Sequence, residues 1–302
     1  MLVVAALGGN ALLRRGEALT AEVQRTNIQV AARSLAAIIQ AGHRLVVTHG
    51  NGPQVGLLAL QGAAYKPDEA YPLDVLGAET EGMIGYMIEQ ELENALEHSQ
   101  PVATLLTQVV VDPKDPAFKK PSKFVGPVYD KTEAESRAKA AGWAIARDGD
   151  RWRRVVSSPR PVEIPDWKVL KLLLDQGVIV VCAGGGGIPV VRRADGSLFG
   201  IEAVIDKDAA SALLARQLHA DALLLLTDVE AVFQGYGQAD AVALSSLTPQ
   251  KARSLGAPSG SMGPKLAAAA EFAETGGFAG IGRLADAIAI LEARAGTKIA
   301  RD

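Results

Sequence analysis

Short, continuous apolar runs alternate along the chain with longer stretches in which apolar side chains recur every three or four positions. The runs at 2–7, 44–48, 178–182 and 222–226 are typical of buried strands, because they are brief and mostly aliphatic. The stretches at 21–41, 73–96, 206–218 and 264–274 have helical spacing. Gly42 stands where the first helix would end, and Pro53 stands where another would begin. This alternation predicts an α/β fold with a mainly parallel sheet.

The segment 112–165 departs from this rhythm. It holds clustered prolines and two short β-like pieces, 143–147 and 151–156, which flank Asp148-Gly149-Asp150 and predict a hairpin. A segment of this length without a strand–helix unit is more typical of a protruding subdomain or lid than of a core element, and a surface insertion is the alternative. We therefore expect one α/β domain over residues 1–302 with a subdomain at 112–165 inserted in it.

Composition and charge narrow the classes of protein to which this chain can belong. The chain has 302 residues, of which 48% are apolar and 22% charged, with a formal net charge of −3, so it is an ordinary globular chain. Both signs of charge are scattered, which gives no basic stripe for a nucleic acid. No apolar run is long enough for a membrane span, and the start of the chain lacks the basic region of a secretory signal. A single cysteine, Cys182, excludes a disulfide framework and suits a reducing cytosol, so we expect a cytoplasmic protein.

Glycine clusters follow three of the predicted strands. They are Gly8-Gly9, Gly50-Asn51-Gly52 and Gly184-Gly185-Gly186-Gly187. Turns at the carboxyl ends of parallel strands meet at one sheet edge, and glycine lets backbone N–H groups converge there on an anion. Three such turns favour phosphate or carboxylate binding over simple turn geometry. The P-loop motif is absent, and the glycines from Gly50 onward do not have the spacing of a dinucleotide-binding fingerprint.

Several charged residues stand at the starts of predicted helices. Lys207 lies between Asp206 and Asp208, and Lys265 lies in the first turn of the helix at 264–274. A lysine at a helix start opposes the helix dipole, which suggests an anionic partner. Asp208 would pair with the lysines and hold them, whereas Asp206 alone is interpreted as a helix N-cap.

The remaining candidates are weaker. Lys123, in the segment 112–165, is either a site residue or one more solvated lysine. Asp228 ends a strand where a ribose or a metal–phosphate group would sit. His49 would line the site beside Asn51, but no second histidine at metal-ligand spacing supports a metal site of the protein's own.

Anion-binding turns together with lysines are typical of phosphoryl transfer from a nucleotide, which depends on positioning and charge neutralisation. A kinase that acts on an alcohol needs a general base near the nucleophile, and no isolated Asp or His is an obvious candidate. An acceptor that is already an anion, such as a carboxylate or a carbamate, needs none. The residues by themselves indicate an anionic acceptor of this class, but they do not identify which acceptor it is.

The ordered motifs resemble the carbamate kinase branch of the amino acid kinase family. They are Ala6-Leu7-Gly8-Gly9-Asn10-Ala11, Thr48-His49-Gly50-Asn51-Gly52-Pro53-Gln54-Val55-Gly56, Gly184-Gly185-Gly186-Gly187-Ile188-Pro189, Val204-Ile205-Asp206-Lys207-Asp208, Leu226-Thr227-Asp228-Val229 and Gly260-Ser261-Met262-Gly263-Pro264-Lys265. Ala6 stands where related kinases have a lysine, and Pro121-Ser122-Lys123 also resembles this branch. Two positions depart from the family pattern: Phe124 replaces a common proline, and Cys182 replaces a small residue.

The resemblance implies a three-layer αβα sandwich and the reaction ATP + carbamate ⇌ ADP + carbamoyl phosphate. It also implies Mg²⁺ bound mainly through the nucleotide phosphates, a cytoplasmic homodimer, and ATP formation at the end of arginine catabolism. Another acyl-phosphate-forming kinase of the same fold and a sensor without turnover are the alternatives.

The resemblance also implies roles for individual residues. Lys207 and Lys265 would neutralise the transferring phosphoryl group, Asp208 would orient them, and Lys123 would reach in from the lid. The remaining predicted site residues fall into two sets, those that would hold carbamate and phosphate (Gly8, Gly9, Asn10, Gly50, Asn51, Gly52) and those near the nucleotide (Gly184, Gly185, Asp228, Val232, Phe233, Met262).

Overall fold

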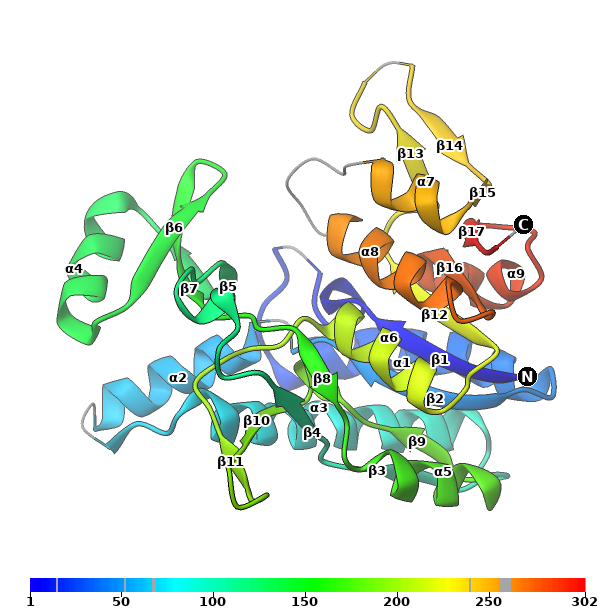
Figure 1. Ribbon diagram of the computed structural model, residues 1–302, viewed down its shortest axis with the longest axis horizontal. Helices are drawn as coiled ribbons and strands as arrows, with labels where there is room; N and C mark the ends of the chain where they lie inside the picture. The colour runs from blue at the N-terminus through cyan, green and yellow to red at the C-terminus, as the bar shows by residue number, and fades with distance from the viewer. Residues whose placement is uncertain (15, 52, 67–68, 239, 256–261, 302) are drawn as a thin grey trace.

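A mainly parallel sheet forms the centre of the protein. The computed structural model describes residues 1–302 apart from 15, 52, 67–68, 239, 256–261 and 302. Eight strands follow the order β15-β17-β16-β12-β1-β2-β9-β3 (Figure 1). From β16 to β3 all neighbours are parallel, and β17 is antiparallel to β16. The strands are β15 (Ser246–Leu247), β17 (Thr297–Ile299), β16 (Phe278–Arg283), β12 (Ala222–Thr227), β1 (Leu2–Leu7), β2 (Arg44–His49), β9 (Ile179–Val181) and β3 (Val102–Thr104).

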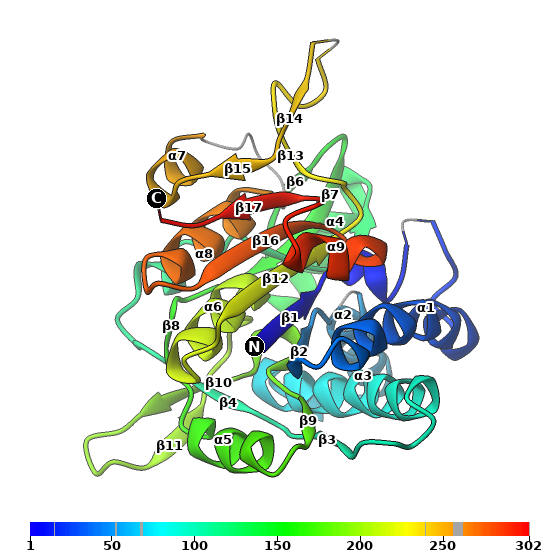
Figure 2. The same ribbon diagram turned by 90° about the vertical axis from the view of Figure 1, so that its right-hand side faces the viewer.

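Helices cover both faces of this sheet (Figure 2). On one face lie α5 (Trp167–Asp175), α6 (Lys207–Gln217), α7 (Pro249–Ser254) and α8 (Met262–Ala273). On the other lie α1 (Ala21–Gln40), α3 (Leu73–Ala95) and α9 (Ala287–Leu291). A separate hydrophobic core fills each interface, because β1 and its neighbours are buried on both sides. The predicted three-layer αβα architecture is confirmed.

The predicted strands and long helices lie within a few residues of their expected bounds, but several other elements were missed, and two of them show why. In β16, Gly280 and Gly282 interrupt the apolar run, and a Cβ at either position would press against Ile290 of α9. The glycines therefore let α9 pack closely against the strand. Because they break the apolar pattern, the strand could not be predicted from the sequence. In α4 (Lys131–Ala141) only Ala134 is buried, so this helix has no apolar stripe to reveal it.

Residues 123–156 form a separate antiparallel sheet, β5-β7-β6, which α4 accompanies on one side. We call this unit the subdomain; it stands apart at the left of Figure 1. Its strands are β5 (Lys123–Tyr129), β6 (Ala144–Asp148) and β7 (Arg151–Val156), and the β6–β7 hairpin confirms the predicted one. Whether residues 112–165 act as a lid stays a prediction.

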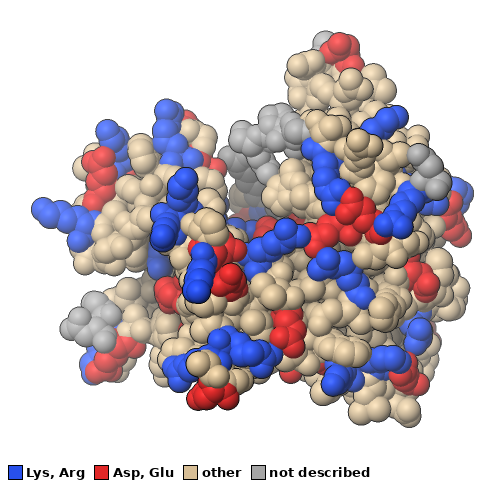
Figure 3. Space-filling model, in the orientation of Figure 1, with Lys and Arg blue, Asp and Glu red and all other residues tan. Residues whose placement is uncertain are grey.

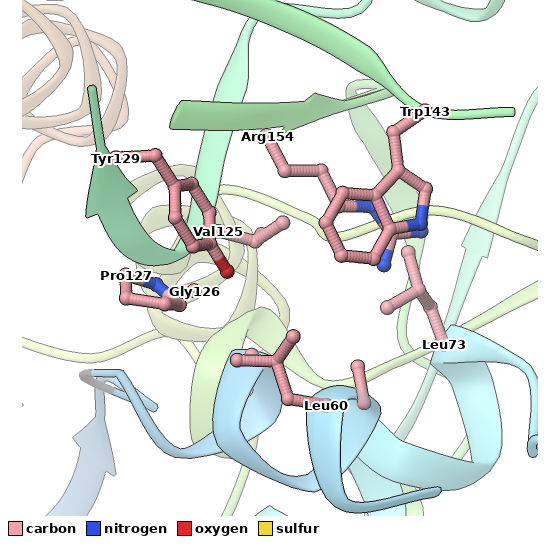
Figure 4. Close-up of a pocket in the computed structure, with 10 residues that line it drawn as sticks. Leu60, Leu73, Val125, Gly126, Pro127, Tyr129, Trp143 and Arg154 are labelled. Atoms are coloured by element: carbon pink, nitrogen blue, oxygen red, sulfur yellow. The ribbon is translucent and has the colours of Figure 1, made fainter. Parts of the chain in front are cut away.

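The subdomain rests on α2 (Gln54–Tyr65) and the start of α3. Figure 4 shows Tyr129 and Trp143 of the subdomain facing Leu60 and Leu73 across a small apolar cavity of about 10 Å³. That volume is about the size of one water probe, too small for a substrate. Gly56 of α2 lies directly against Gly126 of β5, where a Cβ would overlap the partner backbone.

A second small sheet, β11-β10-β4-β8, lies against α3 through β10 and against α6 through β8. It consists of β4 (Gln108–Val111), β8 (Pro161–Glu163), β10 (Ile188–Arg192) and β11 (Leu198–Gly200), and β13 (Val232–Gln234) pairs separately with β14 (Val242–Leu244). Short 3₁₀ turns complete the chain: η1 (Gly9–Ala11), η3 (Pro116–Phe118), η4 (Gly184–Gly186) and η5 (Leu284–Asp286). None of the helices in the described part of the chain is long and apolar enough to cross a membrane.

Candidate active site

The carboxyl ends of β1, β2 and β12 lie side by side. Their register pairs Leu7 with His49 on one side and with Leu226 on the other, so the turns that follow begin at one edge. The N–H of Gly8 donates to Leu226 O at 3.0 Å, and the N–H of Gly50 donates to Leu7 O at 3.1 Å. These two glycines continue the strand ladder. This corrects the expectation that their own N–H groups bind an anion.

At this edge one carboxylate lies between two buried ammonium groups. Lys207 Nζ donates to Asp208 Oδ1 at 2.6 Å, and Lys265 Nζ donates to Asp208 Oδ2 at 2.8 Å. The side chains of Lys207, Asp208 and Lys265 are 12%, 6% and 6% exposed. The first two come from the first turn of α6 and the third from the first turn of α8. We call these three residues the lysine–aspartate cluster.

The charges of this cluster do not cancel. Burial alone would raise the pKa of Asp208, but the two ammonium groups lower it below its usual range. Burial lowers the pKa of Lys207, and Lys265 lowers it further, whereas Asp208 opposes both effects. Two cations therefore share one anion away from solvent. An anionic ligand that reached the cluster would be strongly attracted, because the surrounding dielectric is low.

The glycine-rich turn after β9 is held in place by a buried glutamate. Glu81 of α3 accepts the N–H of Gly184 on Oε1 at 2.8 Å and the N–H of Thr107 on Oε2 at 3.2 Å. Gly185 has φ of 65° and Gly186 has φ of 97°, a region that favours glycine. The glycines thus allow the conformation of the turn, and Glu81 of α3 holds the turn in place.

The same turn packs tightly against the turn after β2. A Cβ at Gly184 would overlap the ring of His49, and one at Gly185 would overlap the side-chain amide of Asn51. Glycine is therefore needed at both positions for the two turns to meet. Gly185 and Asn51 both line the cleft described below, whereas Gly184 is buried and is not part of its lining.

Three buried titratable groups lie near these turns. Burial lowers the pKa of His49 to about 4, raises the pKa of Glu81 to about 8 and raises the pKa of the Cys182 thiol. The Nδ1–H of His49 donates to its neighbour, Gly50 O, at 3.0 Å, so the neutral ring carries its proton on Nδ1. Burial favours the uncharged form of each group, so Cys182 is no thiolate nucleophile.

A large open cleft lies between the sheet edge and the subdomain. Its volume is about 1470 Å³. Figure 3 shows acidic and basic side chains interspersed where the two parts of the molecule meet. Its lining includes most of the predicted phosphate and catalytic positions, namely Gly8, Gly9, Gly50, Asn51, Lys123, Lys207, Asp208 and Lys265. The lining also includes Arg147, Asp148 and Arg153 of the subdomain, Arg160 from the segment after it, and Gly185, Asp206 and Glu271.

Lys123 reaches the body of the protein across this cleft. Its Nζ donates to Asp206 Oδ2 at 2.7 Å. The side chain of Lys123 is 34% exposed and that of Asp206 is 26% exposed. The sequence left open whether Lys123 is simply solvated, and the structure shows an ion pair instead.

The residues predicted near the nucleoside lie away from the lining of the cleft. Asp228 follows β12 and accepts a hydrogen bond from Thr227. Val232 is buried in β13, where its N–H donates to Thr297, and Phe233 follows it. Met262 opens α8 and packs against the hydrophobic core. Asn10 lies in η1, and Gly52 lies outside the described residues.

Sequence reasoning missed Glu81. The available signal was its position in the buried stripe of α3 that also contains Leu76, Ile84 and Ile88. A charged residue in an otherwise apolar stripe needs partners, and here they are backbone N–H groups. The contribution of Arg147, Arg153 and Glu271 to the cleft left no comparable signal in the sequence, because each looks like an ordinary surface charge.

A comparison with known families agrees with this geometry. The model of the amino acid kinase family matches residues 1–280. The match covers most of the chain, so the chain belongs to the amino acid kinase family and is a phosphotransferase. Within that family it is similar to proteins of one branch, the carbamate kinases.

Two curated carbamate kinases show this similarity over nearly their whole length. The one from Rhizobium meliloti is 58% identical over 302 residues, which cover 99% of this chain and 93% of that protein. The one from Haemophilus influenzae is 56% identical, with 100% and 97% covered. Among solved structures, carbamate kinase from Giardia lamblia bound to AMP-PNP has a TM-score of 0.91 and 41% identity, with 100% and 98% covered. The resemblance inferred from the sequence motifs is confirmed.

Proposed function

We propose that the protein catalyses reversible phosphoryl transfer between ATP and carbamate. An oxygen of carbamate attacks the γ-phosphorus as the bond to the bridging oxygen of ADP breaks, which gives carbamoyl phosphate and ADP. The observation that carries the proposal is the lysine–aspartate cluster, with its uncompensated positive charge beside the glycine turns of the cleft. Phosphoryl transfer depends mainly on such fixed charges and on positioning.

Lys207 and Lys265 neutralise the transferring phosphoryl group in this mechanism, and Asp208 holds both ammonium groups in place. Lys123 approaches the phosphates from the subdomain. The turns at the ends of β1 and β2 hold carbamate and the moving phosphoryl group. Because the N–H groups of Gly8 and Gly50 are used within the sheet, we assign the anion contacts to the following residues, Gly9, Asn10 and Asn51.

The proposed acceptor is already an anion, so it needs no general base to remove a proton. Every carboxylate that lines the cleft in the described part of the chain already has a cation or a backbone N–H as a partner: Asp115, Asp148, Asp206, Asp208 and Glu271. None of these five is left without a partner to serve as a general base. This supports carbamate or another carboxylate-like acceptor rather than an alcohol.

Mg²⁺ fits this site as a partner of the nucleotide. No group of three or more His, Cys, Asp or Glu side chains suited to a metal ion occurs among the described residues. The ion would therefore be held mainly by the nucleotide phosphates, which Mg²⁺ commonly prefers to an all-protein cage. When bound, it supplies further charge neutralisation. ATP synthesis at the end of arginine catabolism, a cytoplasmic location and a homodimer stay predictions, as do nucleoside contacts by Asp228, Val232, Phe233 and Met262.

A coupled assay tests this function. ADP and carbamoyl phosphate are mixed with the protein, and ATP formation is followed with and without Mg²⁺. We expect ATP only with Mg²⁺ present. Acetylglutamyl phosphate and aspartyl phosphate serve as comparison donors. Activity with these alone would identify another acyl-phosphate kinase, and nucleotide binding without turnover of any donor would identify a sensor.

Substitution of either cluster lysine tests the assignment of the catalytic groups. Lys207→Ala or Lys265→Ala should lower kcat by about 10²–10³, comparable to the loss of one preorganised donor. Lys114→Ala is a matched control, because Lys114 is exposed and lies outside the lining of the cleft. A rate close to that of the wild type for both cluster variants would refute the assignment.

A further inference from the structure

Asp206 makes two different kinds of contact with its two oxygens. Oδ1 accepts the N–H groups of Asp208 at 3.0 Å and Ala209 at 3.2 Å, which caps the start of α6. Oδ2 accepts the ammonium group of Lys123 at 2.7 Å. The cap by itself uses one oxygen and needs no charge, since Asn caps helices about as well as Asp. The second oxygen and the negative charge are therefore available for another task.

Lys123 depends on this contact for its position. It stands at the first residue of β5, where the subdomain begins, and a third of its side chain is exposed. A free lysine in such a place samples many rotamers, and restricting it during a reaction costs entropy. Its ammonium group has three donors, so one can bind Asp206 while the others face the cleft.

We propose that Asp206 is a positioning residue that holds Lys123 at the phosphoryl-transfer site and so links the subdomain to the helix of the lysine–aspartate cluster. The inference rests on the proposed function only in assigning Lys123 to the phosphates. Asp206 immediately precedes Lys207 in the chain. One residue thus fixes the start of α6 and the lysine that faces it across the cleft.

A second carboxylate offers a matched control. Among the described residues, two ion pairs join the subdomain to the body, Lys123–Asp206 and Arg154–Glu202. Glu202 also divides its oxygens: Oε2 accepts the N–H of Leu73 at the start of α3 at 2.8 Å, and Oε1 lies 3.6 Å from Arg154. Neither Glu202 nor Arg154 lines the cleft.

A double-mutant cycle in the coupled assay tests the proposal. Asp206→Asn keeps the helix cap and removes the charge. We expect it to lower kcat about 5- to 20-fold, the scale of an unrestrained lysine side chain, with a smaller change in KM. In a Lys123→Met background the same substitution should cost less than about 2-fold, because the residue it acts through is gone. Glu202→Gln should change kcat less than about 2-fold.

Competitive acetylation of lysines gives a readout that does not depend on turnover. The ammonium group held by Asp206 should react slowly, and exposed Lys119 and Lys120 serve as internal references. In Asp206→Asn the labelling of Lys123 should rise several-fold relative to these references, whereas Glu202→Gln should leave it unchanged.

The outcomes separate this inference from the proposed function. An equal loss from Asp206→Asn in both backgrounds would show that the charge of Asp206 acts independently of Lys123. Unchanged labelling of Lys123 would show that the ion pair does not hold it. Either result overturns the inference. A wild-type protein that makes no ATP from carbamoyl phosphate would instead contradict the proposed function, and the labelling experiment would still decide the role of Asp206.

Discussion

The lysine–aspartate cluster makes a strong prediction about stability. Asp208→Asn changes little in size but leaves two ammonium groups in a buried place without a counter-charge. In the native protein the carboxylate lies 2.6 Å from one ammonium nitrogen and 2.8 Å from the other. Removing one member of a buried ion pair typically costs about 3–5 kcal/mol, because the remaining charge stays desolvated.

This cost converts into a measurable shift of the melting temperature. A globular protein gains about 2.1 cal/mol/K of unfolding entropy per residue, so a chain of 302 residues gains roughly 0.6 kcal/mol/K. A loss of about 3–5 kcal/mol should therefore lower Tm by about 5–8 °C. Calorimetry on the ligand-free protein measures the shift, provided that unfolding is reversible.

Glu271 provides the matched control, because it also bridges two cations. It lies 2.6 Å from Arg160 and 2.9 Å from Arg216, but its side chain is 25% exposed and that of Arg160 is 70% exposed. Water screens such a pair, so Glu271→Gln should cost less than about 1 kcal/mol. The contrast between the two variants isolates the effect of burial from the effect of removing a carboxylate.

The pH dependence identifies the cause of the loss. Two uncompensated ammonium groups lower each other's pKa in the folded Asp208→Asn variant, whereas the unfolded chain keeps ordinary lysines. The unfolded state then binds more protons as pH rises toward 10, so the stability of the variant should recover in that range. Equal Tm losses for Asp208→Asn and Glu271→Gln, or a loss that does not shrink at high pH, would refute this reasoning.

Two further predictions concern the buried turns. Gly185→Ala should lower kcat/KM more than about 10-fold, because the added Cβ would displace the side-chain amide of Asn51. Gly196→Ala is the control: Gly196 also has a positive φ, 85°, but there is open space around it, so this variant carries the backbone strain without the steric overlap. For Glu81 the pKa is about 8 in the fold against 4.5 in the unfolded chain, so the folded state binds more protons and stability falls as pH rises through this window. Between pH 6.5 and 8 the free energy of unfolding should fall by about 2 kcal/mol because of Glu81. His49 has the opposite effect on stability, but only at lower pH, between about 4 and 6.5. Denaturant unfolding should show a weaker decline in Glu81→Gln, and an unchanged decline would contradict the assignment.

Much of the fold follows from local patterns. The strands β1, β2, β9 and β12 are continuous apolar runs because both faces of the sheet are covered, and such runs are visible without any structure. The helix starts at Thr20 and Asp206 are likewise marked by capping side chains. Elements whose packing depends on a neighbour were not visible: β16 needs its glycines for α9, and α4 buries a single alanine.

The chemistry of the candidate site divides in the same way. The order of residues along the chain shows which ones follow each strand and open each helix, and this was enough to predict the glycine turns, Lys207, Asp208 and Lys265. How these groups are used depends on the packed fold. It placed the charge of Asp206 on Lys123, gave the N–H groups of Gly8 and Gly50 to the sheet, and set Glu81 behind the turn at Gly184. Hydrogen bonds and ion pairs between residues far apart in the chain depend on distances that no local pattern contains, because the packing of the whole sheet fixes them.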